Sequence, residues 1–288
     1  MKGYLVVNSF YGGKKMDEIS GYIIQSGWRN NVDISVVKTG ELLHSYECLK
    51  GLMCDFVLFW DKDVILARML EDVGYRVFNS SQAISTCDNK ALTYMRLYGH
   101  GVAMPKTVVA PLTFEGINYC DWDFAEKAAD FLGFPMVVKE LYGSFGQQVY
   151  LARDMDELKN TVSGLKHKGF LMQEMIDTSF GKDIRINIVG GEVVSAMLRY
   201  NENGDFRSNI SNGGSMRAYE PSEAQKQIAI EACKALGLDF AGVDVLFGAG
   251  DEPLICEVNS NPHFKSSIDC TGIDVSDHII KHIKEALR

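Results

Sequence analysis

Short apolar runs alternate with amphipathic segments over roughly the first 85 residues of the chain. The apolar runs have the length of buried strands and cover 3–8, 33–37, 55–60 and 75–79. Segments between them, around 15–27 and 63–73, have the apolar spacing of helices. Strands that alternate with helices predict a small parallel α/β layer.

The pattern changes after this layer, where helices and strands no longer alternate regularly. The expected helices cover 88–99, 123–132 and 154–166. The expected strands cover 103–109, 135–140 and 169–174, with a glycine-containing loop and strand at 141–151 between the last two. This mixture indicates an α+β arrangement for the middle of the chain.

Paired strands dominate the last third. Segments 183–189 and 192–200 are joined by Gly190 and Gly191, a strong hairpin signal. A polar loop (201–218), a helix (221–236), two strands (241–247 and 254–259) and a terminal helix (275–287) follow. We therefore predict three domains, with boundaries at 1–85, 86–172 and 173–288.

Two carboxylates and an amide interrupt the apolar strands of the last hairpin. If the turn is centred between Gly250 and Asp251, Asp244 lies opposite Glu257. Asn259 follows Glu257 by two residues and shares its face. Facing carboxylates repel one another unless a proton or a cation lies between them. Hard oxygen ligands without histidine or cysteine favour Mg²⁺ or Mn²⁺, with a solvated polar face as the alternative.

Cations and glycines that could contact phosphates occur upstream. Lys139 ends a strand, and Gly143, Ser144 and Gly146 belong to the loop after it. Glycine lets backbone N–H groups approach phosphates closely. Lys90, near the start of a helix, could reach the same phosphates. Taken singly, the loop could be an ordinary hairpin turn and Lys90 a surface lysine.

A base site and an anion site can also be read from the pattern. The apolar strand 171–176 could offer backbone groups to a purine, although its Met and Ile side chains also suit a core. Charged and polar residues follow it on neighbouring strands and in the next loop. They are Asp183, Arg185, Arg199, Arg207, Ser208 and Asn209. Arginines suit phosphates and carboxylates because the guanidinium presents a planar fork of donors.

The order of these motifs resembles the ATP-grasp superfamily. The motifs are Lys90, PMVVKE, the glycine loop, LMQEMI, KDIRI, FRSNISNGG, AGVDVL, CEVNSNP and TGID. Within the superfamily, D-x-R, RSN-x-x-x-GG, EVN-x-x-P and TGID are most similar to the RimK-like amino-acid ligases. The resemblance covers roughly residues 75–288. It implies two α+β subdomains that clasp ATP, preceded by a small α/β domain.

The same resemblance implies an ATP- and Mg²⁺-dependent carboxylate–amine ligase (ADP-forming), which makes an amide through an acylphosphate. Its substrate would be an amino acid or a short peptide. The residues implied for ATP binding are Lys90, Lys139, Gly143, Ser144, Gly146, Gln173, Glu174, Met175, Ile176, Asp183, Arg207, Ser208 and Asn209. Those expected to act in catalysis are Arg185, Arg199, Arg207 and Asn209. Asp244, Glu257 and Asn259 would hold Mg²⁺, with two ions expected, and His263 and Lys265 are candidate substrate contacts.

Two departures from the family pattern bear on which activity within the family is expected. Gln148 stands where relatives commonly have a further glycine. Ile210, Ser211 and Asn212 follow the RSN motif, where members that modify ribosomal proteins carry a basic, histidine-containing segment. With the acidic net charge of −9, this disfavours glutamylation of a protein tail. That activity, and a nucleotide-binding protein that has lost ligase activity, are the alternatives.

Composition excludes several other classes. The chain has 288 residues, of which 46% are hydrophobic, and no apolar run approaches the ~18–20 residues that span a bilayer. The negative net charge argues against binding to a nucleic acid backbone. Seven cysteines without a C-x-x-C pair favour a reduced, cytoplasmic protein. Dimers or tetramers are common in similar enzymes, so a homo-oligomer is a further expectation.

Overall fold

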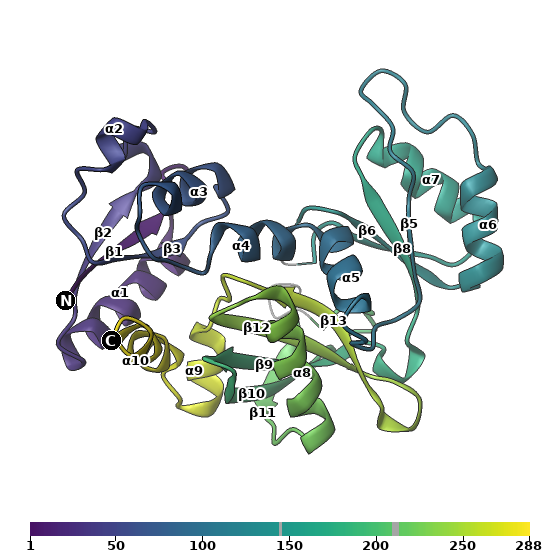
Figure 1. Ribbon diagram of the computed structural model, residues 1–288. Coiled ribbons are helices and arrows are strands. Elements are labelled where there is room, and N and C mark those ends of the chain that lie inside the picture. The colour runs from purple at the N-terminus through teal and green to yellow at the C-terminus, as the bar shows by residue number, and fades with distance from the viewer. Residues whose placement is uncertain (144–145, 209–212) are drawn as a thin grey trace.

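The computed structural model describes residues 1–143, 146–208 and 213–288. Three sheets lie side by side, and the helices cover them (Figure 1). The arrangement confirms the predicted combination of an α/β layer with two α+β parts.

The N-terminal sheet is parallel and has the strand order β2-β1-β3-β4. Its strands are β1 (Lys2–Val7), β2 (Asp33–Lys38), β3 (Phe56–Trp60) and β4 (Val77–Phe78). Its helices are α1 (Lys14–Arg29), α2 (Tyr46–Leu49) and α3 (Val64–Asp72), with a 3₁₀ turn, η1 (Thr39–Glu41). Every residue of β3 is buried, as expected for a parallel strand covered on both faces.

The predicted helix 88–99 is confirmed as α5 (Lys90–Tyr98), with both ends within two residues. A separate helix before it, α4 (Ser81–Asp88), was not predicted. Asn89 separates them because its extended backbone ends α4, and its side chain accepts hydrogen bonds from Ala91 N and Leu92 N at the start of α5. Lys90 is therefore the first residue of a helix, as the sequence predicted.

The middle sheet has the order β5-β8-β6-β7. Its strands are β5 (Thr107–Val109), β6 (Met136–Glu140), β7 (Val149–Ala152) and β8 (Phe170–Glu174). Helices α6 (Asp123–Leu132) and α7 (Met155–Leu165) pack on it, and Phe170 lies in the core that they share.

The third sheet has the order β11-β10-β9-β12-β13. Its strands are β9 (Lys182–Val189), β10 (Glu192–Tyr200), β11 (Ser215–Ala218), β12 (Phe240–Phe247) and β13 (Pro253–Asn259). Helix α8 (Glu223–Leu236) packs on it, and 3₁₀ turns η2 (Asp177–Ser179) and η4 (Ala249–Asp251) adjoin its strands. Gly190 and Gly191 have φ of 60° and 81°, as the predicted β9–β10 hairpin requires. Strand β11 was not predicted, because its sequence lies within the polar loop.

The C-terminal part of the chain packs against the N-terminal layer. Helices α9 (Lys265–Thr271) and α10 (Val275–Ala286) follow β13, and α10 lies beside α1 (Figure 1). Ile279 and Ile283 share a buried core with Leu5 and Phe56 of the N-terminal sheet. The three-domain division stays a prediction, but the N-terminal core is completed by the last helix.

Candidate active site

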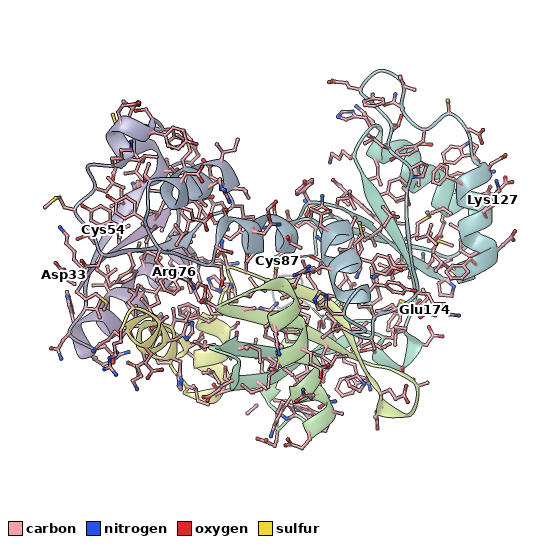
Figure 2. All side chains as sticks on the ribbon, viewed as in Figure 1. Asp33, Cys54, Arg76, Cys87, Lys127 and Glu174 are labelled. Atoms are coloured by element: carbon pink, nitrogen blue, oxygen red, sulfur yellow. The ribbon has the colours of Figure 1, made fainter. Side chains whose placement is uncertain are left out.

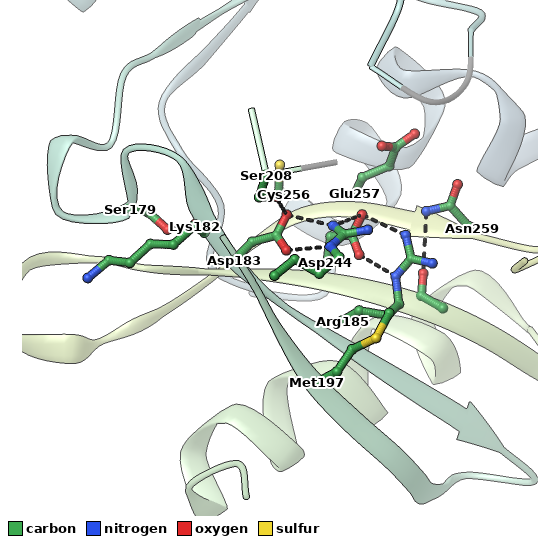
Figure 3. A network of polar contacts seen from close by, with 12 residues as sticks. Ser179, Lys182, Asp183, Arg185, Met197, Ser208, Asp244, Cys256, Glu257 and Asn259 are labelled. Atoms are coloured by element: carbon green, nitrogen blue, oxygen red, sulfur yellow. Dashed lines mark hydrogen bonds and ion pairs between the residues drawn. The ribbon is translucent and has the colours of Figure 1, made fainter. Parts of the chain in front are cut away.

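The β12–β13 hairpin has the predicted register at its polar positions. Asp244 lies opposite Glu257, and Gly242 lies opposite Asn259. The register shifts after Asp244, so Cys256 is an extra residue in a β-bulge. In Figure 3, Glu257 and Asn259 follow one another along β13 above Asp244. The three predicted metal ligands therefore come from one hairpin.

Arginines supply the positive charge beside Asp244. Arg185 Nε lies 2.5 Å from Asp244 Oδ1, and Arg185 Nη2 lies 2.9 Å from Oδ2. Arg199 Nη2 lies 2.9 Å from the same Oδ2. Burial alone would raise the pKa of Asp244, but the two guanidiniums outweigh it and lower that pKa. The carboxylate thus stays ionised inside the protein.

The same network extends to Asp183. Arg199 donates from Nε to Asp183 Oδ1 at 2.7 Å and from Nη2 to Oδ2 at 2.6 Å, and Ser208 Oγ donates to Oδ2 at 2.6 Å. Each principal ion pair joins residues directly opposed on neighbouring strands: Arg185 with Asp244, and Arg199 with Asp183. Burial lowers the pKa of Arg199, while Asp183 and Asp244 raise it further than burial lowers it. We call these four charged side chains the buried charge network, and Figure 3 labels three of them: Asp183, Arg185 and Asp244.

A first cavity opens between the middle and third sheets. Ten of the residues predicted to bind ATP line it. They are Lys90, Lys139, Gly146, Gln173, Glu174, Met175, Ile176, Asp183, Arg207 and Ser208. Gly143 lies instead at the second cavity described below, and Ser144 and Asn209 lie outside the described residues.

The apolar end of the first cavity follows the end of β8. Met175 and Ile176 lie just beyond this strand, while Val137 and Leu246 contribute further apolar surface. Two of the predicted contacts are already engaged within the protein. The Gln173 side chain donates to Thr107 Oγ1 at 2.9 Å, and a Glu174 carboxylate oxygen accepts from Lys106 N at 2.8 Å. We infer that their side chains shape this wall.

Basic side chains gather at the polar end. Lys139 is 9% exposed, and its Nζ lies 3.7 Å from Cys256 Sγ. Lys90 Nζ lies 3.7 Å from a Glu257 oxygen and 3.4 Å from the carbonyl of Gly143. Arg207 lines the same cavity. A divalent metal and a polyphosphate both suit this mixture of carboxylates and cations.

Asp205 orients Arg207. It accepts from Arg207 Nε at 3.1 Å and from Nη2 at 2.8 Å, and Arg207 Nη1 donates to the carbonyl of Gly146 at 3.0 Å. The hydrogen bond with Asp205 raises the pKa of Arg207. Arg207 therefore joins the glycine loop to the third sheet. Sequence reasoning missed Asp205, as well as Lys182 and Cys256 in the cavity wall.

A second cavity lies beside the first. Three residues of the buried charge network and the hairpin line both cavities: Arg199, Asp244 and Glu257. Arg185, Asn259, His263 and Lys265, all predicted site residues, line the second cavity alone. Burial lowers the pKa of His263, and Lys265 Nζ lies 2.5 Å from Asp269 Oδ2. The predicted substrate contacts are thus beside the predicted metal ligands.

The N-terminal layer also contributes to the second cavity, which the sequence analysis did not predict. Lys14 and Lys15 at the start of α1, and Lys62 after β3, are in its wall. These residues are about 200–250 positions away from His263 in the chain, so no local pattern connects them. The only signal was the pair of glycines that precedes Lys14 after the first strand.

The donor set suits a magnesium ion. Asp244 Oδ1 accepts one arginine hydrogen bond and keeps lone-pair capacity, while Glu257 is 33% exposed at the junction of the cavities. Asn259 Nδ2 points to the carbonyl of Gly242 at 3.5 Å, so its oxygen faces the other way (Figure 3). Among the described residues, no group of three or more His, Cys, Asp and Glu side chains is arranged to hold a metal. Two carboxylates, an amide and phosphate oxygens remain a fitting set.

Within the described ranges, no helix has the length and apolar character needed to cross a membrane.

Comparisons with known proteins agree with this geometry. A family model for the RimK-like ATP-grasp domain matches residues 87–283. The chain is 34% identical to the probable alpha-L-glutamate ligase of Marinomonas sp., over 87% of this chain and 80% of that protein. It is 36% identical to human N-acetylaspartylglutamate synthase A over 79% of this chain, but the match spans only 57% of the human protein.

Solved structures share the fold at low identity. The RimK domain ATP-grasp protein of Sphaerobacter thermophilus superimposes with a TM-score of 0.76, at 18% identity, over 98% of this chain and 99% of that one. The D-alanine–D-alanine ligase of Bacillus anthracis, solved with ATP, gives a TM-score of 0.74 at 20% identity, over 100% and 97% of the two chains.

Proposed function

Because the chain belongs to the RimK-like ATP-grasp family and is an ATP-dependent carboxylate–amine ligase, we propose that it activates a carboxylate as an acylphosphate and joins it to an amine. The family uses ATP and Mg²⁺. We further propose that the substrates are amino acids or short peptides, with glutamate as one partner. The printed names of the ligase and synthase relatives support glutamate.

One observation carries the proposal: Arg199, Asp244 and Glu257 line both cavities. A phosphoryl group that passes from a nucleotide to a second substrate must cross such a junction. The residues expected at the crossing are cations and oxygen ligands that neutralise phosphate charge. A site that only stored a nucleotide would need no second cavity at its phosphate end.

The chemistry has two steps. A carboxylate oxygen of the substrate attacks the γ-phosphorus of ATP, the bond to the β–γ bridging oxygen breaks, and ADP leaves. The amine then attacks the acyl carbon, phosphate leaves with the C–O bond electrons, and the amine loses a proton.

Mg²⁺ held by Asp244, Glu257 and Asn259 would neutralise phosphate charge, and we propose two ions. Lys90, Lys139 and Arg207 hold the phosphates, and Arg185 and Arg199 face the transferring group from the second cavity side.

The contact between Arg207 and the carbonyl of Gly146 supports a role in excluding water. It joins the glycine loop to the third sheet across the first cavity. A closed cavity would protect an acylphosphate from hydrolysis.

The decisive experiment measures ADP release with ATP and Mg²⁺ across pairs of amino acids and dipeptides, followed by mass spectrometry of the products. We expect ADP and an amide product only with the correct pair, and no product when EDTA removes Mg²⁺. Nucleotide binding without turnover across the whole panel would favour the alternative of a nucleotide-binding protein without ligase activity. Turnover only with a protein acceptor would favour the protein-tail-modifying glutamate ligase.

We expect Lys139→Met to weaken ATP binding by about tenfold or more, because it removes a buried cation from the polar end of the first cavity. Equilibrium binding of a fluorescent ATP analogue measures the change. Lys127→Met is the matched control, since Lys127 is exposed on the outer helix α6 (Figure 2). If the two variants bind the ATP analogue with equal affinity, Lys139 does not contact the phosphates.

Compartment and assembly are further proposals. All seven cysteines are free thiols, which supports a reducing compartment such as the cytoplasm. A homodimer or homotetramer remains an expectation from similar enzymes, and light scattering of the purified protein tests it.

A further inference from the structure

The second step of the proposed reaction takes a proton from the attacking amine, and a group in the second cavity has to accept it. A carboxylate is a weaker base than an imidazole, and carboxylates of this wall are already engaged. Asp88 and Asp269 pair with lysines, while Asp244 and Glu257 are candidate metal ligands. The imidazole of His263 lies in the same wall and is the side chain type that most often serves as a base.

The His263 ring is held at one nitrogen and bare at the other. The ring hydrogen-bonds to the backbone of Lys15, and this bond raises the pKa of His263, as a bond donated to a carbonyl does. Nε2 has no hydrogen-bond partner among the described residues, so Nδ1 makes the bond to Lys15. With Nδ1 as the donor, the neutral ring carries its lone pair on Nε2.

The surroundings favour the neutral ring. Burial is the largest effect and lowers the pKa of His263, and the charges of Lys15 and Arg185 lower it further. Glu18 and the bond to Lys15 act in the opposite direction. The pKa of His263 therefore lies below its ordinary value, and the ring is able to accept a proton at pH 7. The charged side chains of the wall around it come from α1, β9 and α9: Lys14, Lys15, Glu18, Arg185, Lys265 and Asp269.

A second bare acceptor belongs to Asn261, which lines the same cavity. Its Nδ2 donates to the carbonyl of Asp61 at 2.8 Å, so Oδ1 is the atom left without a partner among the described residues. Asn261 Oδ1 and His263 Nε2 are both buried, and unpartnered buried acceptors are costly. A ligand group that offsets this cost has to be a hydrogen-bond donor. Of the two reacting groups in the proposed function, the amine donates and the carboxylate does not.

We propose that His263 is the general base of amide formation. As the amine nitrogen bonds to the acyl carbon, its proton moves to His263 Nε2, and the electrons of the C–O bond leave with the phosphate. The proton then passes to solvent when the products leave. This inference rests on the proposed function for the reaction, and it assigns the proton that the second step releases.

Hydroxylamine distinguishes a base from a structural residue. It is a strong nucleophile and largely unprotonated at pH 7, so its attack on an acylphosphate depends little on a base from the protein. His263→Asn is the test variant, because the amide nitrogen of asparagine replaces Nδ1 at the Lys15 carbonyl and nothing replaces Nε2. With ATP, Mg²⁺ and the common amino acids, we expect this variant to form the amide about a hundredfold more slowly than the wild type. With hydroxylamine in place of the amine, it should form the hydroxamate within about threefold of the wild type.

The pH profile of amide formation gives a second readout. In the wild type the rate should fall as the pH drops through the lowered pKa of His263, because a protonated ring cannot accept a proton. His263→Asn should lack this limb. His167→Asn replaces an exposed histidine beyond α7 and should match the wild type in both assays and in the pH profile.

Equal losses of amide and hydroxamate in His263→Asn would show a structural role and overturn the assignment. An amide rate or a pH profile that is unchanged in His263→Asn would reject His263 and retain the ligase. If the wild type releases no ADP with any amino acid or with hydroxylamine, the proposed function fails, and the role of His263 fails with it.

Discussion

Glu257→Gln is expected to lower ADP release on the order of a thousandfold and to leave the fold intact. The substitution keeps the size of the side chain but removes one of two carboxylates from the candidate metal set. Glu257 lies outside the buried charge network: its nearest cation, Lys90 Nζ, is 3.7 Å away, and 33% of its side chain is exposed. Folding therefore depends little on its charge, whereas a metal held beside phosphates depends on it strongly.

Three measurements separate these effects. Steady-state ADP release gives the activity, thermal unfolding gives the stability, and electron paramagnetic resonance of Mn²⁺ with an ATP analogue gives the metal affinity. Glu252→Gln is the control, because Glu252 is exposed in the turn of the same hairpin. If ADP release by Glu257→Gln stays within threefold of the control and its Mn²⁺ affinity is unchanged, Glu257 is not a metal ligand.

The polar face of the hairpin could be predicted because its determinants are local. A strand alternates faces every two residues, and the glycine-containing turn sets which residues oppose each other. These rules placed Asp244 opposite Glu257. They did not predict the bulge at Cys256. The pairs next to the turn, such as Val245 with Ile255, are one residue out of the predicted register, and the extra residue restores that register at Asp244 and Glu257.

The partners of Asp244 could not be predicted in the same way. Arg185 and Arg199 were assigned to an anion site, yet both neutralise Asp244 in the structure. Their position depends on β9 lying between β10 and β12, a pairing of strands separated by about 50 residues. Likewise, Lys14 reaches the second cavity only because the first helix packs beside the last one. Tertiary packing brings these residues together, and periodicity in the sequence does not predict such long-range contacts.

Helix α4 shows a third limit, because the sequence analysis predicted the helix that follows it and not α4 itself. The eight residues of α4 are fewer than the window in which helical periodicity is read. The Asn89 side chain caps α5, a signal that is visible in the sequence. The functional consequence is small, because Lys90 begins a helix in the prediction and in the structure.

Asp244→Asn should differ from Glu257→Gln because it damages the fold as well as the activity. The side chains of Asp244, Arg185 and Arg199 are 5%, 11% and 6% exposed. Removing the carboxylate leaves two guanidiniums facing the single charge of Asp183. Breaking a buried pair from one side costs about 3–5 kcal/mol. Urea unfolding followed by circular dichroism should show this loss as a lower midpoint, and ADP release should also be abolished.

The balance of charges in the buried charge network predicts how the stability lost in Asp244→Asn can be recovered. Arg185→Gln alone leaves two carboxylates facing Arg199, whereas the double variant with Asp244→Asn leaves the balanced pair of Asp183 and Arg199. The double variant should therefore be more stable than the sum of the single losses by about 2 kcal/mol. It should remain inactive, because the metal ligand is still absent. Glu220→Gln removes an exposed partner of Lys226 and should not move the urea midpoint. If the losses in unfolding free energy of the two single variants add strictly, Arg185 and Asp244 stabilise the fold independently. If the double variant regains ADP release, Asp244 serves the fold rather than the metal.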